Sequence, residues 1–493
     1  MRRPSLYSII VAFLLILIFC GFFTVLWLLA GSYSFGWDEA VYLTKARSWI
    51  EDTPADTFGI YRPIGMASVG WVILQWSDSE KIVRAFGVLF GAAALVFIFL
   101  LFAQAVNIWV ALSITLLVGT SPLFLSEAPQ FFNDVPAAGF LFALLWLILR
   151  YYQTAGKSRL IYFAAPIAAF AFYLRYGIIL QLGIIALISF SALSKKFWNK
   201  EGADIWPFIK TGILFLALVA PHFLYSLAVT ENFFGVLSLG SEVAGRKYLG
   251  EGLVDYMRWL PSTLAGPLVG GCVILGVIVV LIILFRKKLR KEYEELLWLG
   301  GIGILVFFFT GLLVHAEARY VFFPVVLISG AGISGIYFML SRWLALRDIL
   351  IGLFIISILY FGVGHYKGVD AFFRERENNL FRNAYTKSYK AIQPNSGEPG
   401  CAVWTTQYFP QVSWYSECNV IRVADEAAFK KNFQKYIGKN QYSIAYSELN
   451  DVQIQPATAE KYGLTLTEIY NTPDLSESFG FGRVSIYRME VVR

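Results

Sequence analysis

The sequence predicts a polytopic α-helical membrane protein with a small α/β domain in its C-terminal part. The chain has 493 residues, of which 57% are hydrophobic and only 15% carry a charged side chain. Soluble domains usually have about 25% charged residues. Uncharged apolar runs of roughly 18 residues or more recur along the chain, and each is long enough to cross a bilayer core of about 30 Å.

About eleven apolar runs are expected to cross the membrane. The first, Leu6–Ala30, is longer than the apolar region of a secretory signal and follows Arg2 and Arg3, so we expect an uncleaved span. The full set covers approximately residues 6–30, 82–103, 108–126, 135–149, 160–174, 177–193, 209–230, 263–285, 297–314, 320–340 and 348–366.

The Lys and Arg residues of the short loops give these spans a direction. The strongly basic connections, among them Arg286-Lys287-Lys288-Leu289-Arg290-Lys291, all fall on one side of the expected spans. Because such loops stay in the cytoplasm, we expect a cytoplasmic N-terminus in a plasma (inner) membrane. The same loops explain the net charge of +7 without a nucleic-acid partner. The outer side then receives residues 31–81, 127–134, 231–262, 315–319 and those after about 367.

The composition changes near residue 367. Residues 1–366 form the expected transmembrane domain, and residues 367–493, which are polar and charged, form an extracytoplasmic α/β domain. Asp425–Ile437 is expected to be an amphipathic helix of this domain. Five short runs predict strands: Ala402–Thr405, Val420–Val423, Ser443–Tyr446, Leu464–Tyr470 and Val484–Tyr487.

The four cysteines fall into two pairs of different character. Cys401 and Cys418 lie in the C-terminal part and can form a disulfide if that part is in an oxidising compartment. Cys20 and Cys272 lie in apolar runs, where they are expected to be buried small hydrophobic residues.

The first outer segment contains two adjacent acids, in Trp37-Asp38-Glu39-Ala40-Val41-Tyr42. The spacing of apolar residues over Asp38–Ile50, with tryptophans nearby, predicts an amphipathic helix at the membrane interface. Asp38 has two compatible interpretations. It can cap the start of the helix, or it can be a general base in a partly apolar cleft, where its raised pKa lets it accept a proton from a substrate.

A second acid and three arginines stand at the expected outer ends of spans. Asp134 begins the fourth span, where it can cap the helix or act opposite Asp38, orienting an acceptor or helping to hold a metal. Arg62, Arg175 and Arg319 can each be explained as residues that extend to the interface. Together they predict a cationic patch that faces the acids and suits recognition of a phosphate.

The run His315-Ala316-Glu317-Ala318-Arg319-Tyr320 gathers ionisable residues at the outer mouth between two spans. Glu317 and Arg319 can form a local surface pair, or they can belong to the same site as Asp134. The chain has only 3 histidines, and their spacing does not predict a zinc site. No Asp, Glu, Lys or Arg stands near the middle of an expected span, which argues against a proton- or ion-coupled transporter.

The order of these residues resembles that of the GT-C superfamily of membrane glycosyltransferases. A first span is followed by Asp38-Glu39-Ala40-Val41-Tyr42, then Arg62-Pro63, then Asp134-Val135-Pro136 at the start of a later span. Within the superfamily the pattern is most similar to the dolichyl-phosphate-mannose protein mannosyltransferases and the bacterial lipid A aminoarabinose transferase. His315-x-Glu317-x-Arg319-Tyr320-x-x-Pro324 is similar to a motif of several GT-C mannosyltransferases. Roughly residues 1–340 share the resemblance.

The resemblance implies a GT-C-like catalytic domain and an inverting transfer of a sugar from a polyprenyl-phosphate donor to an acceptor hydroxyl on the extracytoplasmic side. Asp38 would be the base, assisted by Glu39, and Asp134 would be the second acidic position. Arg62 would contact the donor phosphate. The other candidates are assigned by position: Arg175, His315 and Arg319 to the donor phosphate, and Tyr42, Tyr61, Glu317 and Tyr320 to the acceptor or pocket.

Two other functions remain open at this point. A transporter or flippase of lipid-linked sugars would need polar residues along a path through the membrane. A non-catalytic scaffold would leave the paired acids without a role. The expected partners are a polyprenyl-phosphate-linked sugar donor, a protein, lipid or polysaccharide acceptor, and membrane lipids. A divalent metal between the acids and the phosphate is compatible with the pattern but not required by it.

Overall fold

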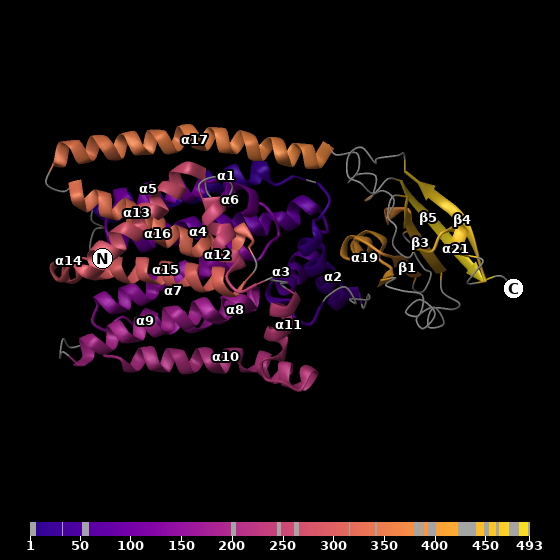
Figure 1. Cartoon of the computed structure of the whole chain (residues 1–493), viewed down its shortest axis with the longest axis horizontal. Helices are drawn as coiled ribbons and strands as arrows, with labels where there is room; N and C mark the ends of the chain where they lie inside the picture. The colour runs from indigo at the N-terminus through magenta and orange to yellow at the C-terminus, as the bar shows by residue number, and fades with distance from the viewer. Residues whose placement is uncertain are drawn as a thin grey trace. The chain divides into compact units, whose positions relative to one another are not determined.

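The chain forms two compact units in its computed structural model (Figure 1). The helical unit comprises Met1–Ala30 and Arg84–Asp370, and the mixed unit comprises Gly31–Val83 and Ala371–Arg493. The expected division of the chain into a transmembrane domain (residues 1–366) and an extracytoplasmic domain (residues 367–493) stays a prediction. The structure describes residues 6–31, 33–51, 59–198, 204–243, 248–260, 266–314, 316–340, 343–378, 386, 389–392, 401–422, 440–447, 453–459, 463–472 and 483–491.

The helical unit is built from long apolar helices that run side by side (Figure 1). Short helices and 3-10 turns connect them. In chain order the elements are α1 (Leu6–Leu29), α4 (Glu80–Ala105), α5 (Ile108–Gly119), α6 (Pro122–Glu127), α7 (Asp134–Gln153), η1 (Arg159–Phe163), α8 (Ala164–Leu174), η2 (Tyr176–Ile178), α9 (Ile179–Trp198), α10 (Trp206–Thr230), α11 (Gly235–Val243), α12 (Glu251–Trp259), α13 (Gly266–Phe285), α14 (Lys287–Glu292), α15 (Glu294–Leu313), η4 (Ala318–Val321), α16 (Phe322–Met339) and α17 (Leu344–Asn378).

The predicted polytopic fold is confirmed, and within the described residues 9 helices are long and apolar enough to cross a membrane. Two of the expected spans are shorter than predicted. The run over 108–126 divides into α5 and α6 because Ser121 caps a new helix and Pro122, which has no N–H to satisfy, occupies its first turn. The run over 160–174 becomes η1 followed by α8, a short apolar segment.

Small residues let the central helices approach closely. A Cβ added to Gly276 of α13 would lie 1.9 Å from the carbonyl oxygen of Ile328 in α16. A Cβ on Gly332 of α16 would lie 2.3 Å from the carbonyl oxygen of Cys272 in α13. Such contacts between backbones are typical of helices packed in membranes, where dispersion replaces the hydrophobic effect.

The mixed unit contains one five-stranded sheet and four described helices. Strand order is β2-β1-β3-β5-β4, with β1 parallel to β2 and β3, and β5 antiparallel to β3 and β4. All five predicted strands are present, whereas the predicted helix Asp425–Ile437 lies outside the described residues. The elements are α2 (Trp37–Glu51), α3 (Ile64–Leu74), β1 (Cys401–Thr405), α19 (Phe409–Ser416), β2 (Asn419–Arg422), β3 (Asn440–Tyr446), α21 (Pro456–Ala459), β4 (Leu464–Asn471) and β5 (Val484–Val491).

A disulfide links Cys401, the first residue of β1, to Cys418, which directly precedes β2. It closes the segment that contains α19. The other two cysteines differ from each other: Cys272 is buried as expected, but Cys20 is exposed on α1. The expectation for Cys20 was wrong because α1 has many outward-facing side chains, which an apolar run does not distinguish from inward-facing ones.

Candidate functional site

One buried carboxylate in the helical unit binds two guanidinium groups. Asp134 is the first residue of α7, and its side chain is only 2% exposed. It forms an ion pair with Arg175. Nε of Arg319 lies 3.6 Å from Oδ2 of the same aspartate. The structure therefore brings together three residues that the sequence predicted to lie at one face of the membrane.

The position of Arg175 follows from a break between two helices. α8 ends at Leu174, and Arg175 has extended backbone angles before the η2 turn begins. Nδ2 of Asn133 donates a hydrogen bond of 2.9 Å to the carbonyl oxygen of Leu174. This bond joins the start of α7 to the end of α8, and so it sets Arg175 beside Asp134.

Glu317 and Tyr320 complete the charged cluster. Oε2 of Glu317 accepts a hydrogen bond of 2.5 Å from Nε of Arg319, so the local pair considered from the sequence does form. Arg319 nevertheless also reaches Asp134, and the pair is part of a larger site. The guanidinium carbon of Arg175 lies 4.0 Å from the ring centroid of Tyr320, a cation–π contact.

Tyr256 of α12 supports this cluster, although no sequence pattern indicated it. Its hydroxyl donates to the carbonyl oxygen of Glu317 at 3.1 Å and accepts from the N–H of Glu317 at 3.2 Å. Burial raises the pKa of Tyr256 above its usual value, although the hydrogen bond to Glu317 and the charge of Arg175 act in the opposite direction. The tyrosine therefore stays protonated and can hold the backbone of Glu317.

A second charged group lies in the mixed unit at the start of α2. Oδ1 of Asp38 accepts a hydrogen bond of 2.6 Å from Nη1 of Arg62, and the two side chains are 18% and 21% exposed. Burial alone would lower the pKa of Arg62, but Asp38, with Tyr42 and Tyr61, holds it above the usual value. The guanidinium carbon lies 5.4 Å from the ring centroid of Tyr61.

Glu39, not Asp38, caps the start of α2. Its fully buried side chain accepts a hydrogen bond of 2.8 Å from the N–H of Gly36, while the carbonyl oxygen of Gly36 accepts from Ala40. This arrangement is the glutamate half of a capping box. Asp38 is thereby left to bind Arg62, and the predicted assistance of Asp38 by Glu39 stays a prediction.

The polar side of α2 is turned to solvent only in part, and its predicted position at the membrane interface stays a prediction. Arg47 is 8% exposed, and its Nη1 donates a hydrogen bond of 2.6 Å to the carbonyl oxygen of Trp414 in α19. Its guanidinium carbon lies 3.6 Å from the ring centroid of Trp414, and Nη1 lies 3.7 Å from Glu417. A contact across 367 positions of sequence explains why local spacing did not indicate the burial of Arg47.

The remaining predictions concern His315 and a metal site. His315 lies outside the described residues. Within the described part of the chain, no three His, Cys, Asp or Glu side chains gather as a group that could hold a metal ion. The charged clusters consist instead of acids paired with arginines.

Comparisons with known proteins agree with this architecture. Residues 63–225 match the family model described as dolichyl-phosphate-mannose-protein mannosyltransferase. ArnT from Cupriavidus metallidurans, bound to undecaprenyl phosphate, has a similar fold with a TM-score of 0.66 and 14% identity, over 96% of this chain and 97% of that one. The chain therefore resembles membrane glycosyltransferases in part of its sequence and in its fold. Its fold is also similar to the Archaeoglobus fulgidus oligosaccharyltransferase AglB, in complex with an inhibitory peptide and a dolichol-phosphate, with a TM-score of 0.54 and 11% identity over 88% of this chain and 69% of that one.

The predicted resemblance of this chain to the mannosyltransferases and to the aminoarabinose transferase is thus confirmed. The apo state of the Cupriavidus metallidurans ArnT gives a TM-score of 0.65 and 14% identity over 97% of this chain and 98% of that one. No curated protein matches the chain significantly. The chain is a multi-pass membrane protein, and the small sheet in its C-terminal part belongs to the same architecture as in ArnT.

Proposed function

We propose that this chain is an inverting glycosyltransferase that moves a sugar from a polyprenyl-phosphate donor to an acceptor hydroxyl on the extracytoplasmic side. The observation that carries the proposal is the buried Asp134 with Arg175 and Arg319, at one end of apolar membrane helices. Guanidinium groups bind phosphate oxygens through two parallel hydrogen bonds. The ArnT structure with undecaprenyl phosphate and the AglB structure with a dolichol-phosphate support a donor of this class.

Asp134 has a positioning role in this proposal. A guanidinium group has five N–H donors and can bind a carboxylate and a phosphate at the same time. Because Asp134 is buried between them, Arg175 and Arg319 are held in fixed directions before the donor binds. Arginines held in this way stabilise the negative charge that develops on the phosphate as the sugar leaves. Tyr320 and Glu317 contact the same arginines and would line the donor pocket.

Asp38 is the proposed general base. Its side chain is 18% exposed and can therefore meet an acceptor. Nη1 of the neighbouring Arg62 donates a hydrogen bond of 2.6 Å to Oδ1 of Asp38 and so orients its carboxylate. Removal of the proton from the acceptor hydroxyl lets that oxygen attack the anomeric carbon, and the polyprenyl phosphate leaves. Tyr42 and Tyr61, which lie close to Arg62, would line the acceptor side.

Transfer from a panel of radiolabelled polyprenyl-phosphate sugars tests this function. Asp38→Asn removes the base but keeps the size of the side chain, and its rate should fall by about 10²–10⁴-fold because general-base catalysis is lost. Asp78→Asn, a change of the same kind at an exposed position before α4, should leave transfer unchanged. Near-normal transfer by Asp38→Asn would show that another group is the base.

A further inference from the structure

The junction of α13 and α14 carries five basic residues that neither charged cluster uses. α13 ends at Phe285, and Arg286, Lys287, Lys288, Arg290 and Lys291 follow within and beside α14. All five side chains are exposed. The sequence alone explains this run as a signal that keeps the loop in the cytoplasm. Such a signal needs positive charge but no folded structure.

The basic run is nevertheless folded onto the helical unit. Leu289, the one apolar residue of the run, packs against a core cluster formed by Val280, Ile283, Leu296 and Ala331. The ring of Tyr293, which directly follows α14, lies 4.4 Å from the ring of Phe338 in α16. These two anchors fix α14 and leave its basic side chains on the outer surface.

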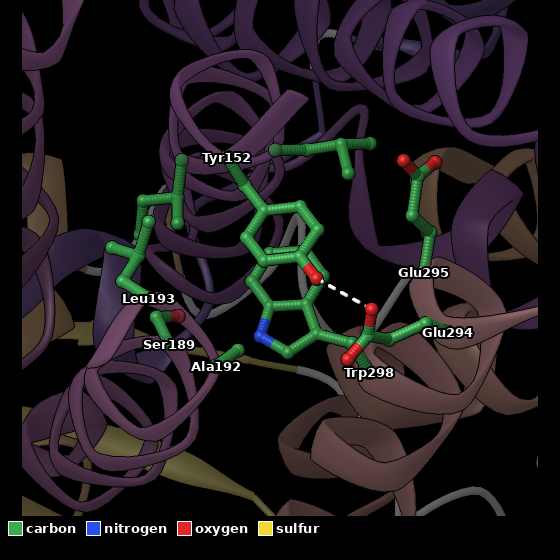
Figure 2. Close-up of a pocket in the computed structure, with 9 residues that line it drawn as sticks. Tyr152, Ser189, Ala192, Leu193, Glu294, Glu295 and Trp298 are labelled. Carbon is green, nitrogen blue, oxygen red and sulfur yellow. Dashed lines mark hydrogen bonds between the residues drawn. The ribbon is translucent and has the colours of Figure 1, made fainter. Parts of the chain in front are cut away.

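Glu292, the last residue of α14, is exposed and forms no ion pair with these cations in the described part of the chain, and the next two carboxylates have other partners. Glu294 accepts a hydrogen bond of 2.7 Å from the hydroxyl of Tyr152 and binds Lys195 of α9 at 3.0 Å. Glu295 accepts from Nε2 of Gln153 at 2.9 Å. Figure 2 shows Tyr152, Glu294 and Glu295 around a small pocket between the helices. Among the described residues, no acid forms an ion pair with any of the five basic side chains.

A groove is lined both by these basic residues and by apolar residues of α13. Its volume is about 590 Å³, and its wall combines residues of the last turn of α13 with the basic run. Phe285 is 80% exposed, which is unusual for a large aromatic side chain outside a membrane. The groove is lined by Leu281, Ile282, Phe285, Arg286, Lys287, Lys288 and Leu289.

We propose that this groove binds an anionic phospholipid of the surrounding bilayer. The phosphate of the headgroup would lie against Arg286, Lys287 and Lys288, and an acyl chain would run along Leu281, Ile282 and Phe285. Basic clusters directly beside a membrane span attract anionic headgroups, and each cation contributes separately. An apolar wall continuous with the charges favours a lipid over a soluble anion.

The lipid groove is separate from the proposed donor site. Both α13 and α15 are 20 residues long, and η4, which carries Arg319, follows the opposite end of α15. A helix of that length spans about 30 Å. The groove and the Asp134 cluster therefore lie at opposite ends of the same helices, and the lipid proposal does not depend on the proposed transferase activity.

Native mass spectrometry of the full chain in detergent tests the proposal. Dioleoylphosphatidylglycerol is titrated against dioleoylphosphatidylcholine, which has the same acyl chains and no net charge. The wild-type protein should retain the anionic lipid preferentially. Lys287→Gln/Lys288→Gln should weaken this retention by roughly 30-fold, since two cations near the headgroup are removed. Phe285→Ser should also weaken it, although it changes no charge.

The control is Lys157→Gln/Arg159→Gln, which removes two exposed cations from another basic connection of the helical unit. This pair should retain the lipid as wild type does. Equal losses in the two double variants would overturn the proposal, because diffuse charge would then explain binding. A lack of preference for the anionic lipid, or full competition by excess glycerol phosphate, would overturn it as well.

Discussion

The sequence and the structure support different roles for Asp134. From its position at the start of an expected span, Asp134 could be a helix cap or a second catalytic acid. In the structure its carboxylate is buried against Arg175 and also approaches Arg319. A carboxylate that binds two cations is a poor proton acceptor, because proton uptake would weaken both ion pairs. Positioning of the arginines explains these contacts better than base catalysis.

Replacement of Asp134 should therefore affect stability as well as transfer. Asp134→Asn leaves two guanidinium groups without their buried counter-charge, and we expect the free energy of unfolding to fall by about 3 kcal/mol. Glu317→Gln, at a side chain that is 34% exposed, should cost less than about 1 kcal/mol. Thermal unfolding of both variants in the same detergent provides the comparison. Equal losses would show that Asp134 is no more important to the fold than a surface pair.

At the scale of elements, α2 depends on a helix far away in the sequence. Apolar spacing predicted α2 and the five strands of the mixed unit, because both patterns are local. The pairing of α2 with α19 has no local signal: Arg47 lies against Trp414, and the hydroxyl of Tyr415 accepts from the N–H of Phe35. Trp414 of a distant helix buries Arg47, which apolar spacing alone assigns to a polar face. No local pattern predicts this contact, so only the structure reveals it.

The α2–α19 contact should control transfer through the position of Asp38. Arg47→Ala removes the hydrogen bond to Trp414 and the stacked guanidinium, so the attachment of α2 to α19 is weakened. We expect the catalytic rate to fall at least tenfold while affinity for polyprenyl phosphate stays unchanged, because the donor contacts lie elsewhere. Lys45→Ala, on the same helix, is the control. A change in donor affinity without a change in rate would contradict this role of Arg47.

The disulfide between Cys401 and Cys418 should stabilise the same element. It joins residues separated by 17 positions and encloses α19. Closing a loop of this size contributes about 3 kcal/mol, chiefly by restricting the unfolded chain. The double variant Cys401→Ser/Cys418→Ser should therefore unfold at a lower temperature, and a reductant should lower the unfolding temperature of the wild type but not of the double variant. If the reductant acts equally on both, the disulfide is not the cause.

For the whole molecule, the sequence predicts which residues lie at the same membrane face better than it predicts which of them form contacts. Span order placed Asp134, Arg175 and Arg319 at one face, and the structure joins them. Which pairs form depends on helix breaks, such as the one at Arg175, and on partners such as Tyr256. Hydropathy does not encode these features, since it averages over whole runs and records no direction of a side chain.

The orientation of the chain follows from its loop charges and can be measured directly. We expect the loop that carries Lys288 to be cytoplasmic and the segment that carries Arg258 to be extracytoplasmic, because basic loops are retained inside. Single cysteines are introduced as Lys288→Cys or Arg258→Cys after Cys20 and Cys272 are changed to Ser. A membrane-impermeant maleimide should label Arg258→Cys in intact cells and Lys288→Cys only after permeabilisation. The reverse labelling would place the Asp134 cluster, which lies at the same ends of the helices as α12, in the cytoplasm and would exclude an extracytoplasmic transferase site.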